Sequence, residues 1–232
     1  MDLNIFTGGF RKKEDPITKA VLKTILNEKL TPLLREIGLT KYNDEYLWYS
    51  DFNEERIRLV FKYDLMKGAS GLFSWGVCFA DVPTYRQTKK LKHHKTDKST
   101  TLHLWDWPRG YSKSFEGGGR PTELISHWGE KECKRTIFEI FNKYGSEIIL
   151  WYKKAGTISG CMEIVTEQIN RGKGAYNMHF PHAKYILIFL TAKLGDKIKA
   201  IELLKAFKEP YVNRDNAWEV MFQKIEKQIE EQ

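Results

Sequence analysis

The sequence predicts an α+β protein: an N-terminal helix on a four-stranded antiparallel sheet, followed by an all-helical C-terminal half. Between residues 45 and 107, apolar and polar residues alternate with the period of strands that have one buried face. After Pro121 the apolar spacing changes to about 3.6 residues, the period of a helix. The chain of 232 residues is long enough to bury a sizeable core. We therefore expect residues 1–120 and 121–232 to pack together as one compact unit.

The first helix is expected to begin at Asp15-Pro16, because aspartate caps free backbone N–H groups and proline fits the first helical position. Leucine and isoleucine then recur at helical spacing up to Gly38, a residue that suits the position after a helix end. Pro32 lacks a backbone N–H group, so we expect a kink or a new start there, with Thr31 as the cap.

The strand signals follow directly. In the clearest of them, Ile57 and Phe61 share one face, while Arg58 and Lys62 point to the other face with Val60. This alternation predicts an antiparallel sheet with one face in water. The four expected strands are Glu45–Ser50, Glu55–Tyr63, Leu72–Ala80 and Thr101–Trp107.

The helical half is expected to open with a helix that contains Cys133 and Tyr144 and ends at Gly145. Gly195-Asp196 predicts a tight link between two antiparallel helices, because glycine ends one helix and aspartate caps the next. The further expected helices are Ser146–Lys154, Ser159–Arg171, Pro181–Leu194, Asp196–Lys208 and Asp215–Glu231.

The order of these parts over residues 15–85 resembles an uncharacterised bacterial family, one of the domains of unknown function. The segments that carry the resemblance are LTPLLREIGLTKYNDEYLWYSD, ERIRLVFKYD and GLFSWGVCFADVP. Leu39 departs from the more typical phenylalanine of that family, and the helical half has no counterpart in it. Such families are often found beside toxin–immunity and other accessory genes. The resemblance therefore implies a protein-binding role and transfers no catalytic residue.

The net charge of +8 is concentrated in one segment. Residues 86–98 carry six cations and the single anion Asp97, so the rest of the chain has a net charge of only +3. Such a patch attracts phosphate-bearing partners, whereas the alternative is a lysine-rich loop that its charge keeps solvated. The six cations are Arg86, Lys89, Lys90, Lys92, Lys95 and Lys98.

Cysteine usage and hydropathy favour a reduced, cytoplasmic protein. Cys78, Cys133 and Cys161 are far apart and odd in number, which argues against a disulfide framework and against a zinc box. The residues before Asp15 lack the features of a signal peptide. The longest apolar run, Tyr185–Leu190, is far shorter than the ~20 residues that span a bilayer. We expect no membrane association and no cofactor.

Enzyme signatures are missing from the sequence. Neither a GxSxG elbow nor a GxxxxGK[ST] phosphate loop is present. A metal- or phosphate-dependent enzyme is kept only as a third hypothesis, because four potential ligands lie close together in the sequence. The alternative is two exposed histidines in a polar loop and a third on a strand face. The four candidate ligands are His93, His94, Asp97 and His103.

A glycine run offers a candidate anion site. Gly117, Gly118 and Gly119 would let the backbone approach a ligand closely, and Arg120 adds a cation. The alternative, which we prefer, is a hinge between the sheet and the helical half, which needs only the conformational freedom of glycine.

The leading hypothesis is a non-enzymatic cytosolic binding protein, immunity-like or accessory, that recognises a protein partner. Its expected contact residues are Trp105, Trp107, Arg109 and Tyr111, because tryptophan, tyrosine and arginine dominate interface hot spots. The alternative for the two tryptophans is burial under the C-terminal helices. The second functional hypothesis is a single-stranded nucleic-acid-binding protein that combines the basic loop with the strand aromatics.

Overall fold

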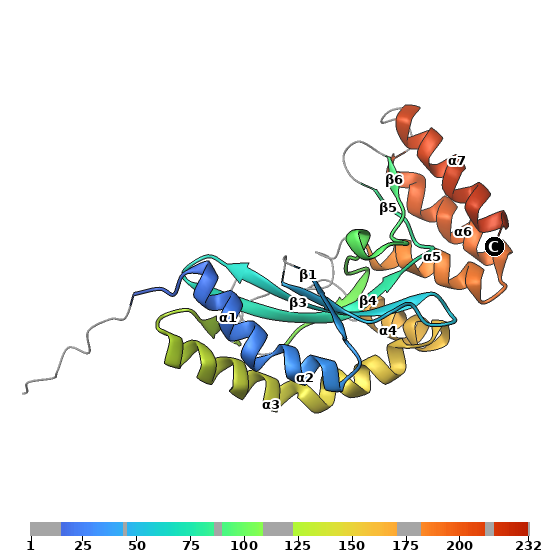
Figure 1. Ribbon diagram of the computed structural model, residues 1–232. Helices are drawn as coiled ribbons and strands as arrows, with labels where there is room; N and C mark the ends of the chain where they lie inside the picture. The colour runs from blue at the N-terminus through green and yellow to red at the C-terminus, as the bar shows by residue number, and fades with distance from the viewer. Residues whose placement is uncertain are drawn as a thin grey trace, which may run out of the picture.

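The computed structural model describes residues 15–43, 46–85, 90–108, 123–170, 182–211 and 216–231. An antiparallel sheet lies in the N-terminal half, and most of the helices follow it in the C-terminal half (Figure 1). The predicted α+β class is therefore confirmed. Within the described ranges, every helix is too short or too polar to cross a lipid bilayer.

The sheet is built around one long hairpin, β3 (Ile57–Met66) and β4 (Ser70–Phe79). The strand order is β1-β2-β3-β4-β7, and β8 also pairs with β4. All four predicted strands are present, as β2, β3, β4 and β7, and two very short strands join them. The outer strands are β1 (Lys41–Asn43), β2 (Leu47–Tyr49), β7 (Leu104–Asp106) and β8 (Ile125–Ser126).

The N-terminal helices are α1 (Lys19–Lys29) and α2 (Thr31–Glu36). The expected start at Asp15-Pro16 is wrong. The Thr18 hydroxyl accepts a hydrogen bond from the Val21 N–H at 3.3 Å and caps α1, while Pro16 forms a β-bridge with Trp128. The new start at Pro32 is confirmed, since α2 begins one residue before it. The predicted cap is wrong: Leu30 is the N-cap, and Thr31 is the first residue of the helix.

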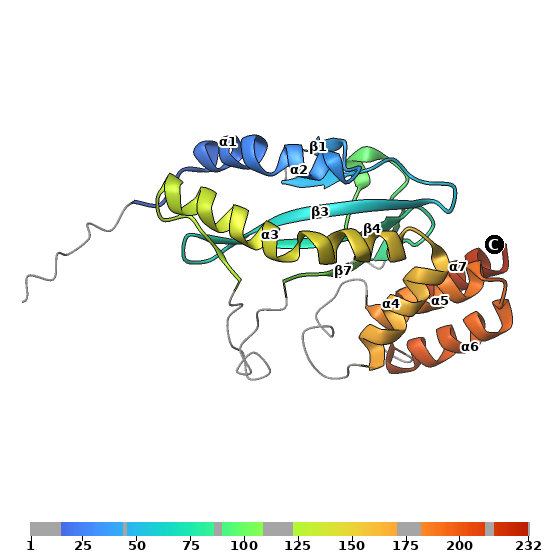
Figure 2. The ribbon, with the colours of Figure 1, turned by 90° about the horizontal axis from the view of Figure 1, so that it is seen from below.

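Helix α3 (Glu130–Ala155) lies along one face of the β3–β4 hairpin, and α1 and α2 lie beside it (Figure 2). It runs unbroken through Gly145, so the predicted end there is wrong. Glycine costs a helix interior only about 1 kcal/mol, and the buried face continues beyond it with Ile148, Trp151 and Tyr152. The Tyr152 hydroxyl donates a hydrogen bond to the Val60 carbonyl at 2.8 Å, which fastens α3 to the sheet.

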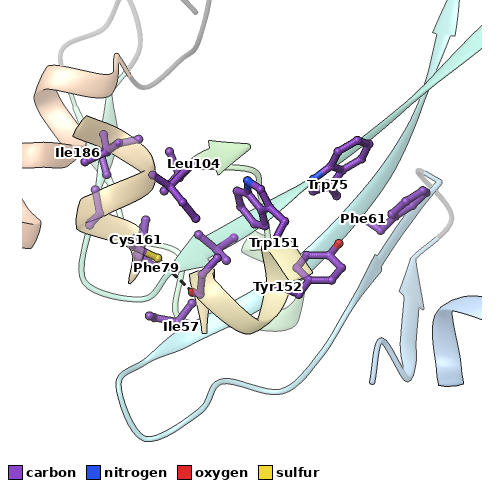
Figure 3. Close-up of a cluster of buried hydrophobic side chains, with 14 of the residues drawn as sticks. Ile57, Phe61, Trp75, Phe79, Leu104, Trp151, Tyr152, Cys161 and Ile186 are labelled. Atoms are coloured by element: carbon purple, nitrogen blue, oxygen red, sulfur yellow. Dashed lines mark hydrogen bonds between the residues drawn. The ribbon is translucent and has the colours of Figure 1, made fainter. Parts of the chain in front are cut away.

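The last four helices, α4 (Ile158–Asn170), α5 (Ala183–Lys193), α6 (Lys197–Lys208) and α7 (Asn216–Glu231), gather at one end of the sheet (Figure 1). The predicted tight link is confirmed: Gly195 has a φ of +91°, and Asp196 caps α6 by accepting from the Lys199 N–H at 3.0 Å. Figure 3 shows the joint with the sheet, where Phe79, Cys161 and Ile186 meet in one buried cluster.

The second face of the sheet is not fully in water, which corrects the prediction. Val60 and Cys78 are buried on it, together with Leu47 and Tyr49. Arg58, expected to face solvent, is only 3% exposed. The lysine-rich segment, which we define as residues 90–100, lies over this arginine and contacts it.

Candidate binding groove beside the lysine-rich segment

The lysine-rich segment begins as a strand and ends in a tight turn. β6 (Leu91–Lys92) pairs with β5 (Thr84–Tyr85), and a 3-10 turn, η1, follows at Asp97–Ser99. Its lysines are exposed, as expected for a solvated basic segment, but its backbone is fixed by pairing rather than free. The exposed lysines are Lys90, Lys92, Lys95 and Lys98. Arg86 and Lys89 of the predicted basic patch lie outside the described residues.

Arg58 anchors the segment to the sheet. Its guanidinium donates to the Asp97 carboxylate at 2.6 Å and to the Thr100 hydroxyl. The same group lies 4.1 Å from the ring centroid of Phe52, a cation–π distance. Desolvation acts to raise the pKa of Asp97, but hydrogen bonds from Lys41 and Arg58 outweigh it and lower that pKa. Asp97 is therefore ionised at neutral pH, and its ion pair with Arg58 holds the lysine-rich segment against the sheet.

Two histidines that the sequence grouped with metal ligands meet in the interior. The rings of His94 and His103 are edge to face with centroids 4.8 Å apart, and both side chains are buried. His94 Nδ1 bonds the Ser99 carbonyl, which only accepts, so Nδ1 carries the proton and Nε2 accepts from the Thr84 hydroxyl at 2.7 Å. His94 thus ties the turn to β5.

His103 has the opposite tautomer. Its Nδ1 accepts a hydrogen bond from the Phe79 N–H at 3.1 Å, so the neutral ring carries its proton on Nε2. That atom is buried and makes no hydrogen bond of good geometry within the described part of the chain. The prediction of exposed or strand-face histidines is therefore wrong for His94, which is 3% exposed. Burial favours the neutral rings.

The four candidate metal ligands do not converge. His93 is exposed at the mouth of a groove, and Asp97 is engaged by Arg58 and Lys41. Both nitrogens of His94 are already hydrogen-bonded. No three His, Cys, Asp or Glu side chains come together as metal ligands in the described ranges.

Stability should fall on mild acidification because of His103. Desolvation, with a smaller contribution from His94, lowers its pKa to about 3, below the ordinary value of 6.5. From pH 6.5 downward to about 3, the unfolded state therefore binds the extra proton, and this single group should remove about 1.4 kcal/mol of stability per pH unit. Urea unfolding at pH 7 and pH 5 measures this slope.

The variant His103→Asn is the control for that slope. The asparagine side-chain oxygen can replace Nδ1 as acceptor for the Phe79 N–H, but it does not titrate. The variant should be less stable than the parent protein at pH 7, and its free energy of unfolding should fall less between pH 7 and pH 5. Equal slopes in both proteins would show that other groups cause the acid sensitivity.

A groove of about 1090 Å³ separates the lysine-rich segment from α7. Leu91, Val220 and Met221 supply apolar surface, and lysines stand on both walls. Figure 1 shows β6 and α7 side by side at this end of the molecule. The other lining residues are Asp81, Lys90, His93, Lys95, Ala217, Lys224, Lys227, Gln228 and Glu231.

The acids of the groove are already neutralised. Asp81 pairs with Arg56 at 2.8 Å and with Lys193 at 3.0 Å. Glu231 lies 3.8 Å from Lys227 on the same helix. The groove's negative charge is therefore matched by cations that are already in place.

Three lysines of the groove remain uncompensated. Lys90, Lys95 and Lys224 have no carboxylate within ion-pair distance in the part of the chain that the structure describes. His93 adds no full charge at neutral pH, because desolvation and, to a smaller extent, the neighbouring Lys95 lower its pKa. The groove therefore has an excess of positive charge around an apolar floor.

Sequence reasoning found only one wall of this groove. The sequence predicts the basic segment at residues 86–98 and a helix at Asp215–Glu231, but it does not relate the two. Val220 and Lys224 are one helical turn apart, a visible signal of a shared face. No feature of the sequence indicates that this face lies opposite β6, more than a hundred residues earlier.

The aromatic surface predicted around β7 is largely internal in its described part. Trp107 is only 4% exposed, and its ring lies 4.8 Å from that of the half-buried Trp105. Gln168 of α4 donates to the Trp105 carbonyl at 2.9 Å. Trp107 is therefore buried, as the alternative interpretation expects, rather than exposed as a contact residue. The remaining predicted contact and anion residues, Arg109, Tyr111, Gly117, Gly118, Gly119 and Arg120, lie outside the described residues.

The cysteines lack the features of nucleophiles. All three thiols are free and buried. Burial raises the pKa of Cys78 and of Cys133 to about 11, and it raises the pKa of Cys161 as well. Each is therefore a protonated thiol at neutral pH, and the thiolate is the reactive form.

No family model, curated protein sequence or solved structure matches the chain. The resemblance of residues 15–85 to a bacterial domain family stays a prediction. The groove must therefore be interpreted from its own geometry and charge.

Proposed function

We propose that the protein is a non-enzymatic binding protein that recognises an acidic protein partner in the groove between the lysine-rich segment and α7. The observation that carries the proposal is the set of three lysines, Lys90, Lys95 and Lys224, that have no carboxylate partner among the described residues and stand on two walls around apolar surface. Cations without partners attract a partner of opposite charge and orient it on approach. The apolar floor then adds affinity by burial.

A protein suits the groove better than a single-stranded nucleic acid. Proteins that bind single strands combine cations with aromatic rings on which the bases stack. Among the described residues that line this groove, His93 has the only ring, and the apolar side chains are aliphatic. Of the two described tryptophans in the sequence-based hypothesis, Trp107 is buried and Trp105 is half-buried. Nucleic acid is therefore the competing outcome of the test.

The reducing cytoplasm is the compartment we propose for this activity. Three buried thiols without a disulfide are consistent with a reducing environment. An immunity-like or accessory role, in which the partner is another protein of the same cell, is consistent with the resemblance of residues 15–85 to a bacterial family.

The charge-reversed variant Lys90→Glu/Lys95→Glu/Lys224→Glu tests the proposal. Its binding to fluorescently labelled poly-L-glutamate in low salt should weaken at least about tenfold, because attraction becomes repulsion. All three side chains are exposed, so the thermal melting temperature should change little. The dissociation constant is measured by fluorescence anisotropy.

The matched control is Lys184→Glu/Lys199→Glu/Lys205→Glu, which makes the same change in net charge at exposed lysines of α5 and α6 outside the groove. This variant should retain most of the binding. If both triple variants lose affinity equally, only net charge matters and the groove is not the site. Tighter lysine-dependent binding of oligouridylate than of poly-L-glutamate would replace the protein partner by a nucleic acid.

A further inference from the structure

The groove has a direction along α7. Ala217, Val220, Lys224 and Lys227 follow each other at intervals of three or four residues, so they share one face of the helix. The face is apolar at the N-terminal end, where Val220 is 45% exposed, and cationic farther along. From Ala217 to Glu231 the wall is about 21 Å long at about 1.5 Å per residue.

The groove also has a defined cross-section. Lys90 and Lys95 stand on the wall formed by the lysine-rich segment, and Lys224 stands on α7. Leu91 and Val220 supply apolar surface from the same two elements. A complementary ligand therefore needs apolar groups along its middle and negative charge along both edges.

We propose that the groove binds an amphipathic α-helix of the partner protein, with its apolar stripe bordered on both edges by aspartate or glutamate. This inference rests on the proposed function and adds the conformation and the side-chain pattern of the bound segment. Placed along α7, about four turns of helix match the length of the wall. A helix of this kind binds through anchors at helical spacing, the recurring helix-in-groove mode of recognition.

An extended segment fits the same groove less well. It would need free backbone groups of the protein to satisfy its own N–H and C=O groups. One wall is a helix whose interior backbone groups are already hydrogen-bonded, and on the other wall β6 is only two residues long. A bound helix brings its own backbone hydrogen bonds and needs only side chains from the groove.

Two synthetic peptides of about 16 residues and identical composition test the inference. In the patterned peptide, leucines recur at i, i+4, i+7 and i+11 with glutamates on both sides of this stripe. In the scrambled peptide, the same leucines are spread around the helix. The patterned peptide should bind at least about tenfold more tightly, and its helical circular-dichroism signal should increase on binding.

The variant Val220→Glu tests the contribution of the apolar lining of the groove while the lysines stay in place. It should weaken binding of the patterned peptide at least about tenfold, because it puts a carboxylate where the leucine stripe would lie. Ile198→Glu is the matched control, since Ile198 is an exposed apolar residue of α6 outside the groove and is 79% exposed. It should leave the affinity unchanged.

The outcomes distinguish the two levels of the proposal. If the patterned and scrambled peptides bind with equal affinity and both bind less tightly to the lysine variant, the bound segment is not a patterned helix, but the proposal of an acidic partner stands. Binding of the patterned peptide without an increase in its helical circular-dichroism signal would also overturn the proposal that the bound segment is a helix. If neither peptide nor poly-L-glutamate responds to reversal of Lys90, Lys95 and Lys224, the proposed function itself fails.

Discussion

Truncation of Trp75 to alanine should lower the free energy of unfolding by about 3–5 kcal/mol, the largest single-site loss that we predict. Trp75 is completely buried in the middle of β4 and faces Tyr144 of α3 with ring centroids 6.4 Å apart. Figure 3 shows its ring in a cluster of buried side chains that also contains Phe61 and Trp151. Removal of the indole would leave a cavity where β4 packs against α3. Urea unfolding followed by circular dichroism measures the change.

Trp75→Phe is the matched control. The indole Nε1–H of Trp75 is buried and has no hydrogen-bond partner in the described ranges. Phenylalanine removes that unsatisfied donor while it keeps an aromatic ring, so the loss of packing is partly offset. We expect a much smaller destabilisation than for alanine. A loss as large as that of Trp75→Ala would mean that the indole makes an essential hydrogen bond.

Gly160→Ala should destabilise the fold by about 3 kcal/mol, the second largest effect. A Cβ atom at this position of α4 would lie 1.8 Å from the Lys154 carbonyl oxygen in the last turn of α3. The obstacle is backbone, so no side-chain rotation can relieve it. The two helices must therefore separate, and α4 also carries Cys161 into the shared core.

Gly145→Ala is the contrasting control within a helix. Its new Cβ would meet only the Phe141 ring at 3.7 Å, an ordinary van der Waals contact. Alanine has the higher helix propensity, so the variant should be more stable than the parent by about 0.5–1 kcal/mol. The pair of measurements, by urea unfolding, would separate steric obstruction from propensity. Destabilisation of similar size at both positions would contradict the explanation.

The groove depends on the interior of the protein for its shape. The ion pair of Arg58 with Asp97 and the bond from His94 to the Ser99 carbonyl hold the lysine-rich segment at the same place. Lys95 lies between these two fixed points, so its position opposite α7 is set by buried groups. From its composition this basic segment is expected only to be solvated. The buried contacts of Arg58 and His94 give it a fixed position.

The sequence by itself determined most of the helices, the longer strands and the location of the charge. Alternation in β3 and β4 and the helical spacing of α3 are local patterns, because burial of one face acts over a few residues. The change of period predicted after Pro121 comes too early, since β8 lies at Ile125–Ser126 and α3 begins at Glu130. The cations of the lysine-rich segment are also visible without coordinates. Local reasoning failed where tertiary packing outweighed it: at the helix start at Asp15, at the helix end at Gly145, and on the second face of the sheet, which is partly buried.

Only the tertiary structure decided which charges lack partners and what lies opposite them. Arg58 and His94 look like surface residues in the sequence, and burial on the second face of the sheet makes them anchors. Lys224 becomes part of a site only because α7 returns to β6. Such pairings depend on how distant elements pack, and no local pattern encodes that information.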